Sequence, residues 1–156
     1  MTIRTISFTL NGQAVTVQAP VAINLLTLLR EYMDITSPKF GCAQGNCGAC
    51  TVLLDGEPVN SCMVLAPTIE GRKVTTVEGV GTPQKPHPLQ LAITEHYGAQ
   101  CGFCTPGMIM SGVALLNKNS HPSRDEVVAA ITGNVCRCTG YKKIVESVLA
   151  AAESMR

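Results

Sequence analysis

Positions 41–50 of this 156-residue chain read GCAQGNCGAC. The segment contains Cys42, Cys47 and Cys50, and Cys62 follows after eleven more residues. The residues between the first three cysteines are glycine, alanine, glutamine and asparagine. Such residues suit a loop that curves around an inorganic centre and turns backbone N–H groups toward its sulfurs. We therefore expect the first half of the chain to be organised around a metal-binding loop.

The spacing of these cysteines, C-x4-C-x2-C with a distant fourth, is typical of the loop that holds the [2Fe–2S] cluster of a plant-type ferredoxin. Four thiolates complete the coordination of two irons. A four-cysteine zinc site and a disulfide-bonded structure are the alternatives. A gap of four residues followed by a gap of two favours the iron–sulfur cluster.

A second group of cysteines lies in the segments QCGFCTPG (100–107) and NVCRCTGY (134–141). Both segments precede a predicted helix, and the N-terminus of a helix offers free N–H groups and a positive dipole end to an anionic cluster. The spacing C-x2-C and C-x-C does not by itself distinguish a [2Fe–2S] cluster from a zinc ion. The metal ligands expected in this group are Cys101, Cys104, Cys136 and Cys138.

The composition is that of a soluble globular protein, with 46% hydrophobic residues, 15% charged residues and a formal net charge of +1. Two oxidised [2Fe–2S] clusters on eight thiolates would bring the net charge of the loaded chain to about −3. This charge argues against nucleic acid as a partner.

The N-terminal residues alternate polar and apolar side chains and do not have the pattern of a signal peptide. No apolar segment is long enough to span a bilayer. We therefore expect a cytoplasmic protein without membrane insertion, since metal-bound cysteines are more common than disulfides in that compartment.

The residues around the first cysteine group predict a small domain of mixed α and β structure. Two strands with period-two alternation, residues 3–10 and 13–19, are joined by Asn11-Gly12, a strong hairpin signal. Asn24 is expected to cap a helix that lies across this hairpin. The apolar stripe of the helix consists of Leu25, Leu28, Leu29 and Met33. Further strands are expected at residues 51–54, 58–62 and 74–77. This order predicts a β-grasp, ferredoxin-like domain over residues 1–79.

A linker follows, because residues 79–88 contain three prolines and two glycines. The pattern beyond it is helical. Helices are expected at residues 88–97, 106–116, 124–131 and 140–152. The third of these begins with the capping box Ser123–Glu126. The second domain, residues 80–156, is therefore expected to be a small all-α, four-helix, [2Fe–2S]-binding domain, which makes the whole fold α+β.

Three motifs in sequence order, GCAQGNCGACTV, QCGFCTPGM and GNVCRCTGY, closely resemble those of the iron–sulfur subunit of the xanthine oxidase family of molybdenum hydroxylases. The resemblance extends from the hairpin to the last helix, and it implies two [2Fe–2S] clusters. The cluster farther from molybdenum is then held by Cys42, Cys47, Cys50 and Cys62. The nearer cluster is held by Cys101, Cys104, Cys136 and Cys138.

The resemblance also implies an electron-transfer subunit without catalytic residues of its own. Electrons are expected to leave the molybdenum cofactor through the nearer and then the farther cluster, toward FAD or another acceptor. Gln100 and Cys138 are implied to contact the pterin of the cofactor, expected in its cytosine dinucleotide form. The implied partners are a large molybdenum subunit and a medium FAD subunit in a dimer of heterotrimers. The large subunit would oxidise an aldehyde, N-heteroaromatic or CO-type substrate.

Two other functions are compatible with parts of the sequence. A free-standing ferredoxin would need only the first cluster, so the helical domain argues against it. A structural zinc adaptor would have no redox role. His87 and His121 lack the spacing of metal ligands and are expected to be surface residues.

Overall fold

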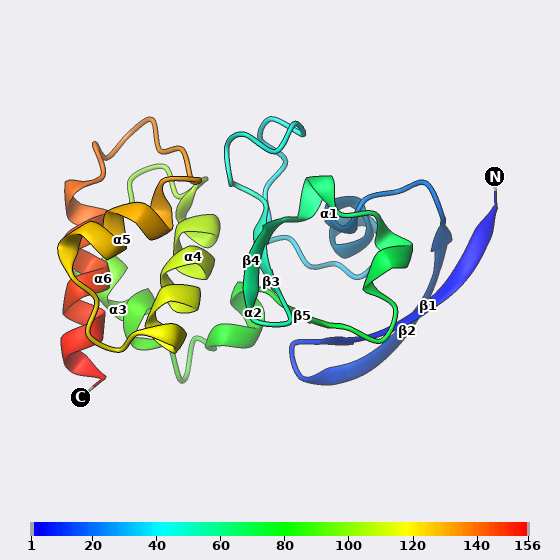
Figure 1. The fold of residues 1–156 in the computed structure, drawn as a ribbon, viewed down its shortest axis with the longest axis horizontal. Helices are drawn as coiled ribbons and strands as arrows, with labels where there is room; N and C mark the ends of the chain where they lie inside the picture. The colour runs from blue at the N-terminus through cyan, green and yellow to red at the C-terminus, as the bar shows by residue number, and fades with distance from the viewer. Residues whose placement is uncertain (1, 156) are drawn as a thin grey trace.

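The computed structural model describes residues 2–155 as a five-stranded sheet beside a group of helices (Figure 1). The strands are β1 (Ile3–Leu10), β2 (Gln13–Pro20), β3 (Thr51–Leu54), β4 (Glu57–Asn60) and β5 (Lys73–Thr75). The α-helices are α1 (Leu25–Thr27), α2 (Val77–Val80), α3 (Pro88–Glu95), α4 (Thr105–Lys118), α5 (Arg124–Ile131) and α6 (Lys142–Ser154). Three further turns are the π-helical η1 (Leu28–Tyr32) and the 3-10 helices η2 (Ser61–Met63) and η3 (Ala66–Ile69). Helices α3 to α6 gather at one end of the molecule, and the β1–β2 hairpin extends to the other (Figure 1).

The sheet has the strand order β2-β1-β5-β3-β4. Strand β1 pairs antiparallel with β2 and parallel with β5, while β3 is antiparallel to both of its neighbours. The hairpin turn places Asn11 (φ 51°) and Gly12 (φ 83°) in the left-handed region, as a two-residue hairpin turn requires. This mixed sheet, with α1 and η1 packed on it, confirms the predicted ferredoxin-like unit.

The first helix begins at the predicted cap, because Oδ1 of Asn24 accepts a hydrogen bond from the Thr27 N–H at 2.9 Å. The α-helix is shorter than expected and continues as the π-helical η1. The side chain of Arg30 then donates to the carbonyls of Thr36 (2.9 Å) and Pro38 (2.8 Å). These bonds fix the chain just before it enters the first cysteine loop.

Two predicted strands end earlier than expected. Strand β4 stops at Asn60 and Cys62 lies in η2, because the Ser61 hydroxyl donates to the Cys50 carbonyl at 2.8 Å and turns the chain. Strand β5 stops at Thr75, and the Thr76 N–H donates to Oδ1 of Asn11 at 2.8 Å. In both places, a hydrogen bond that does not belong to the strand pairing ends the strand.

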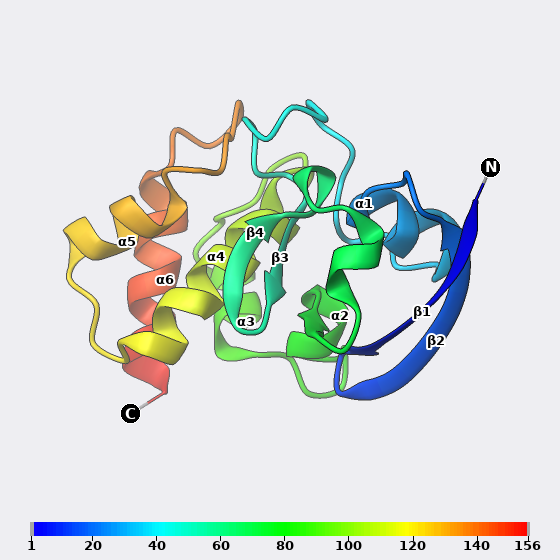
Figure 2. The ribbon, with the colours of Figure 1, turned by 45° about the vertical axis from the view of Figure 1, so that its right-hand side comes forward.

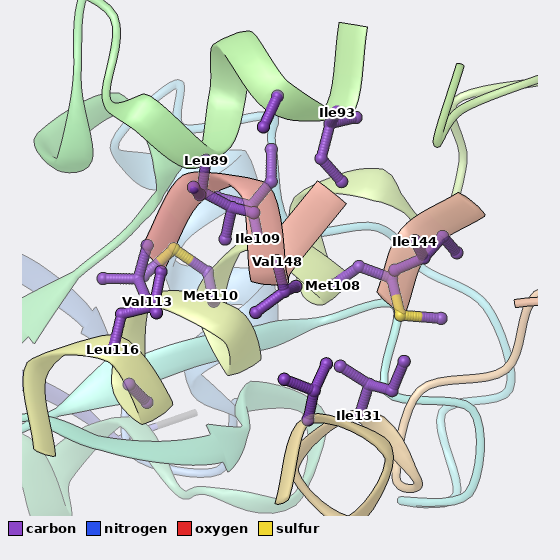
Figure 3. Packing of buried hydrophobic residues seen from close by; sticks show 14 of the residues in the cluster. Leu89, Ile93, Met108, Ile109, Met110, Val113, Leu116, Ile131, Ile144 and Val148 are labelled. Carbon is purple, nitrogen blue, oxygen red and sulfur yellow. The ribbon is translucent and has the colours of Figure 1, made fainter. Parts of the chain in front are cut away.

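Strand β3 is buried on both faces and joins the two parts of the fold. Val52 and Leu54 belong to the core between the sheet and η1, whereas Leu53 belongs to the core of the helices. Successive side chains of a strand point to opposite faces, so a single strand can serve both cores. Figure 3 shows the helical core, to which α3, α4, α5 and α6 all contribute. Its labelled side chains are Leu89, Ile93, Met108, Ile109, Met110, Val113, Leu116, Ile131, Ile144 and Val148.

Helices α3, α4, α5 and α6 lie close to the positions that the sequence predicts, whereas α2 was not predicted. The capping box of α5 is present, with the Glu126 N–H donating to Oγ of Ser123 (3.3 Å) and Oε2 of Glu126 accepting from the Ser123 N–H (2.7 Å). The boundary predicted between residues 79 and 80 falls inside α2, which contacts both β5 and α4, and that boundary stays a prediction. Over residues 2–155, none of the helices combines the length and the apolar character needed to cross a membrane.

His87 has a structural role that we did not predict from the sequence. His87 is half-buried and forms the N-cap of α3, where its Nδ1 accepts from the Leu89 N–H at 3.1 Å. Oε1 of Gln90 accepts from the His87 N–H at 2.8 Å and completes a reciprocal capping box. Burial lowers the pKa of His87 below its ordinary value. The imidazole is therefore held in the neutral form that can accept this bond.

His87 should make the start of α3 sensitive to acid. The pKa of His87 is lower in the folded than in the unfolded chain, so the unfolded chain binds a proton first as the pH falls. The stability of the folded state therefore decreases as the pH drops below about 6.5. Losing an N-cap costs about 1 kcal/mol, which corresponds to a factor of about five in an equilibrium constant. We therefore expect the protection of the α3 amides against hydrogen exchange to fall about fivefold between about pH 7.5 and pH 5.5, after correction for intrinsic exchange rates. His87→Asn keeps a side-chain acceptor that does not titrate, and it should lose this pH dependence. The same pH dependence in both proteins would contradict the assignment.

Candidate iron–sulfur sites

The first cysteine loop curls around the sulfur of Cys42. The backbone N–H groups of Gln44, Asn46 and Cys47 all donate to this sulfur, at 3.4, 3.3 and 3.4 Å. The left-handed backbone of Gly45 (φ 77°) allows these successive N–H groups to point inward. The bonds, led by that from Gln44, lower the pKa of Cys42 to about 6. The loop is therefore built to hold this sulfur as a thiolate.

The four cysteines of the first group approach one another in two pairs. The Cys47 N–H donates to the sulfur of Cys42, and Cys50 and Cys62 belong to the same small buried cluster. The second pair is buried beside Leu26, whereas the first pair is partly exposed. Burial, and to a smaller degree the neighbouring Cys50, raises the pKa of Cys62 to about 11. The Cys62 thiolate therefore needs a positive partner at neutral pH, and a bound metal supplies one.

The second group is also arranged as two pairs. The sulfurs of Cys101 and Cys138 are 3.5 Å apart, and Cys104 and Cys136 both pack against the helical core. Cys101 and Cys138 are exposed, while the other pair lies deeper. Burial, with a smaller contribution from Cys136, raises the pKa of Cys104 to about 12. Helix α4 begins directly after Cys104, so the positive end of its dipole lies at the site, as the sequence predicts. Its first N–H groups are not free, because the Thr105 N–H donates to the Gly102 carbonyl at 3.3 Å and Pro106 has no N–H.

Thr139 and Tyr141 support the second group, although we did not predict a role for either from the sequence. The Thr139 backbone N–H and hydroxyl donate to the sulfur of Cys136 at 3.4 and 3.0 Å. The Tyr141 hydroxyl oxygen accepts from the Cys136 N–H at 2.9 Å. Burial opposes ionisation of Cys136, but the bonds from Thr139 outweigh it and hold the pKa of this thiol below its ordinary value. A hydroxyl one residue after the C-x-C pair is the sequence signal for this role.

The pairing of the sulfurs bears on the choice between zinc and a cluster. A zinc site needs four donors around one atom, whereas a [2Fe–2S] core spreads four cysteines over two irons. Within the described part of the chain, no three His, Cys, Asp or Glu side chains converge on one metal ion. The four cysteines of each group supply the donor set that a [2Fe–2S] cluster needs.

The predicted pterin-contacting residues lie at the surface. Gln100 is exposed, and so are the neighbouring Cys101 and Cys138. Two large apolar side chains, Phe103 and Val135, are also exposed there, at 47% and 54%. A pocket of about 270 Å³ extends from this surface toward the first cysteine loop. Its lining includes Cys47, Cys101, Phe103, Val135 and Cys138.

The two cysteine groups are close together although their sequences are far apart. Figure 2 shows the cyan segment of the first loop and the orange segment around Cys136 side by side. The carbonyl of Cys47 accepts a hydrogen bond from the Val135 N–H at 2.8 Å. Cys47, a candidate ligand of the first group, is thus hydrogen-bonded to Val135, which directly precedes Cys136, a candidate ligand of the second group.

Two family models match the chain, one over each cysteine group. A model described as a 2Fe-2S iron-sulfur cluster binding domain matches residues 8–77. A second model, described as a [2Fe-2S] binding domain, matches residues 76–149. Both regions therefore belong to [2Fe–2S]-binding families.

Known proteins resemble the chain over nearly its full length. It is 46% identical over 149 residues to the nicotinate dehydrogenase small FeS subunit of Eubacterium barkeri, and the match covers 96% of this chain and 95% of that protein. It is 48% identical over 131 residues to the aldehyde oxidoreductase of Megalodesulfovibrio gigas, a match that covers 82% of this chain but 14% of that protein. A chain in the crystal structure of quinoline 2-oxidoreductase from Pseudomonas putida 86 superposes with a TM-score of 0.94 at 42% identity, covering 97% of this chain and 95% of that one. The chain therefore belongs to the [2Fe–2S] small subunits of the xanthine oxidase family of molybdenum hydroxylases.

Proposed function

We propose that this chain is the electron-transfer subunit of a molybdenum hydroxylase complex. It carries electrons from the molybdenum cofactor of a large partner subunit through the second cysteine group and then the first, to FAD or another acceptor. The observation that carries the proposal is that two four-cysteine groups are in direct contact and that one of them reaches the surface at Cys101 and Cys138. Each cluster, when bound, supplies a one-electron carrier.

The eight cysteines are the proposed metal ligands. The cluster farther from molybdenum is assigned to Cys42, Cys47, Cys50 and Cys62, and the nearer one to Cys101, Cys104, Cys136 and Cys138. Backbone N–H groups of the first loop and the Thr139 hydroxyl donate to two of these sulfurs. Hydrogen bonds of this kind stabilise negative charge on the sulfurs, and they are one of the means by which a protein sets the reduction potential of a cluster.

The surface formed by Gln100, Cys101, Phe103, Val135 and Cys138 is the proposed contact with the large subunit. An exposed ligand sulfur allows the partner's cofactor to approach the nearer cluster without intervening protein. Phe103 and Val135 provide apolar area that a partner would bury. The Gln100 amide offers both a donor and an acceptor to the polar edge of the pterin.

The proposed complex is a cytoplasmic dimer of heterotrimers, in which a medium subunit holds FAD and the large subunit holds the cytosine dinucleotide form of the cofactor. Substrate choice is assigned to the large subunit. The named relatives support this assignment, since a nicotinate dehydrogenase and an aldehyde oxidoreductase differ in substrate while sharing this part of the chain. The helical unit with its own cysteine group argues against a free-standing ferredoxin.

The loaded chain should contain about four irons and four acid-labile sulfides, because each cysteine group holds one [2Fe–2S] cluster. Cys47→Ser should remove the electron paramagnetic resonance signal of the farther cluster and retain that of the nearer cluster. Cys136→Ser should do the reverse, so each variant is the control for the other. Stoichiometric zinc, or loss of both signals in a folded variant, would contradict the ligand assignment.

Thr139→Val should make the nearer cluster harder to reduce. The substitution keeps the shape of the side chain but removes the hydroxyl that donates to Cys136. Without this bond, the more negative reduced state loses stabilisation, and the midpoint potential shifts to a more negative value. A redox titration of both signals measures the shift, and the farther cluster serves as the internal reference. A nearer cluster whose potential does not change would show that this hydroxyl has no influence on it.

Gln100→Ala should weaken cofactor binding by the complex while both clusters remain. Removing the partner of a buried polar group costs about 1 to 3 kcal/mol, which corresponds to roughly 5- to 150-fold weaker binding. The readouts are the cofactor content of the purified complex and the rate at which substrate reduces the nearer cluster. Gln44→Ala is the matched control, since this glutamine is exposed in the other cysteine loop. If Gln100→Ala and Gln44→Ala both behave like the parent complex, the proposed contact surface is wrong.

A further inference from the structure

Asn134 lies at the junction of the two cysteine groups with its side chain almost fully buried, at 3% exposure. Its Nδ2 donates to the Gly48 carbonyl (2.9 Å) and to Oγ1 of Thr51 (3.1 Å). Its Oδ1 accepts from the Ser111 hydroxyl at 2.6 Å. The amide therefore uses both donors and its acceptor, and a buried amide that lost these partners would pay a large desolvation cost.

These contacts join the two cysteine groups. Gly48 lies between Cys47 and Cys50 in the first loop, while Asn134 lies two residues before Cys136 in the second. The adjoining bond from the Val135 N–H to the Cys47 carbonyl runs between the same two segments. Ser111, from the middle of α4, anchors the amide from the other side. One side chain thus connects the first loop, α4 and the segment that precedes Cys136.

The backbones at this junction are in direct contact, so the spacing between the loops has little freedom. A Cβ atom on Gly48 would overlap the Gly133 carbonyl oxygen and would lie 2.6 Å from Nδ2 of Asn134. A Cβ atom on Gly107 would overlap the Gly48 carbonyl oxygen. Gly48 also has a left-handed backbone (φ 67°), which other residues adopt only with strain. The loops cannot move closer, and the bonds of Asn134 prevent them from moving apart.

We propose that Asn134 is a positioning residue that fixes the distance between the two clusters. The inference rests on the proposed function, because it concerns the passage of electrons from one cluster to the other. Electron transfer between two centres slows exponentially as their separation grows, so a loose junction would slow the chain's internal step even with both clusters intact. Asn134 touches no ligand sulfur and acts only through the backbone that carries the ligands.

Asn60 provides a matched control. Its Nδ2 donates to the Gly45 carbonyl at 2.8 Å, so it makes the same kind of bond to the same loop as Asn134 does. It lies two residues before Cys62, just as Asn134 lies two residues before Cys136. Oδ1 of Asn60 also accepts from the Thr51 hydroxyl at 3.5 Å. The difference is that both bonds of Asn60 stay within the first cysteine loop and the sheet and do not cross between the two cysteine groups. Asn60→Ala therefore disturbs the first loop but leaves the bonds of Asn134 to the Gly48 carbonyl and the Ser111 hydroxyl in place.

The test uses the cluster-loaded full chain with both clusters reduced, so that both are paramagnetic. Pulsed electron paramagnetic resonance measures the dipolar coupling between them, and hence the distribution of their separation. Asn134→Ala should broaden that distribution or shift it to longer distances. Iron content and the signal of each cluster should be unchanged. Asn60→Ala should give the parent distribution.

Ser111→Ala is the second variant, because Asn134→Ala leaves several polar groups without a partner and can fail to fold. It removes only the bond that orients the amide, and it should broaden the distribution to a smaller degree. A parent-like distribution in a loaded Asn134→Ala chain would overturn the role of Asn134, as would equal broadening in Asn60→Ala. If Asn134→Ala does not fold, a parent-like distribution in Ser111→Ala overturns it. A parent chain that holds zinc or a single cluster would instead overturn the proposed function.

Discussion

The hydrogen bonds at the Gly48 carbonyl are the contact on which the arrangement of the two cysteine groups depends. This oxygen accepts from the Thr51 N–H (3.1 Å) and hydroxyl (2.7 Å) and from the Asn134 amide (2.9 Å). The first two bonds close the cysteine loop onto β3, and the third attaches it to the helical unit. The junction is buried, so each polar group must find its partner within the protein. In the described residues, every buried side-chain nitrogen and oxygen does so.

Each site combines a stabilised thiolate with a deeply placed cysteine. Hydrogen bonds lower the pKa of Cys42 and of Cys136, whereas burial raises the pKa of Cys62 and of Cys104. The protein alone stabilises only part of the negative charge that four thiolates carry, and bound iron must compensate the remainder. Metal binding is therefore coupled to the folding of both loops. Burial on one side and exposure of Cys101 and Cys138 on the other leave one face of the second site open to solvent.

Features that depend on neighbouring residues could be predicted from the sequence. The Asn11-Gly12 hairpin, the cap at Asn24 and the capping box at Ser123 form as expected, because each needs only a few consecutive residues. The cysteine spacing predicted the first four-ligand group for a similar reason, since three of its ligands lie within nine residues of one another. The second group comes from two segments far apart along the chain, and its assignment depended on the order of the three motifs. Taken with the order of the motifs, this spacing was sufficient to predict the fold class and the family.

The sequence by itself determined the local elements, and its motifs indicated the fold class and the family. Only the tertiary structure decided how these parts meet. Asn134 and Gly48 are 86 residues apart in sequence, and no local pattern predicts their bond. The half-burial of His87 and the early end of β4 at Asn60 likewise depend on how distant segments pack. The physical reason is that burial and long-range hydrogen bonds exist only once the chain has closed on itself, whereas turns and caps are fixed by the residues beside them.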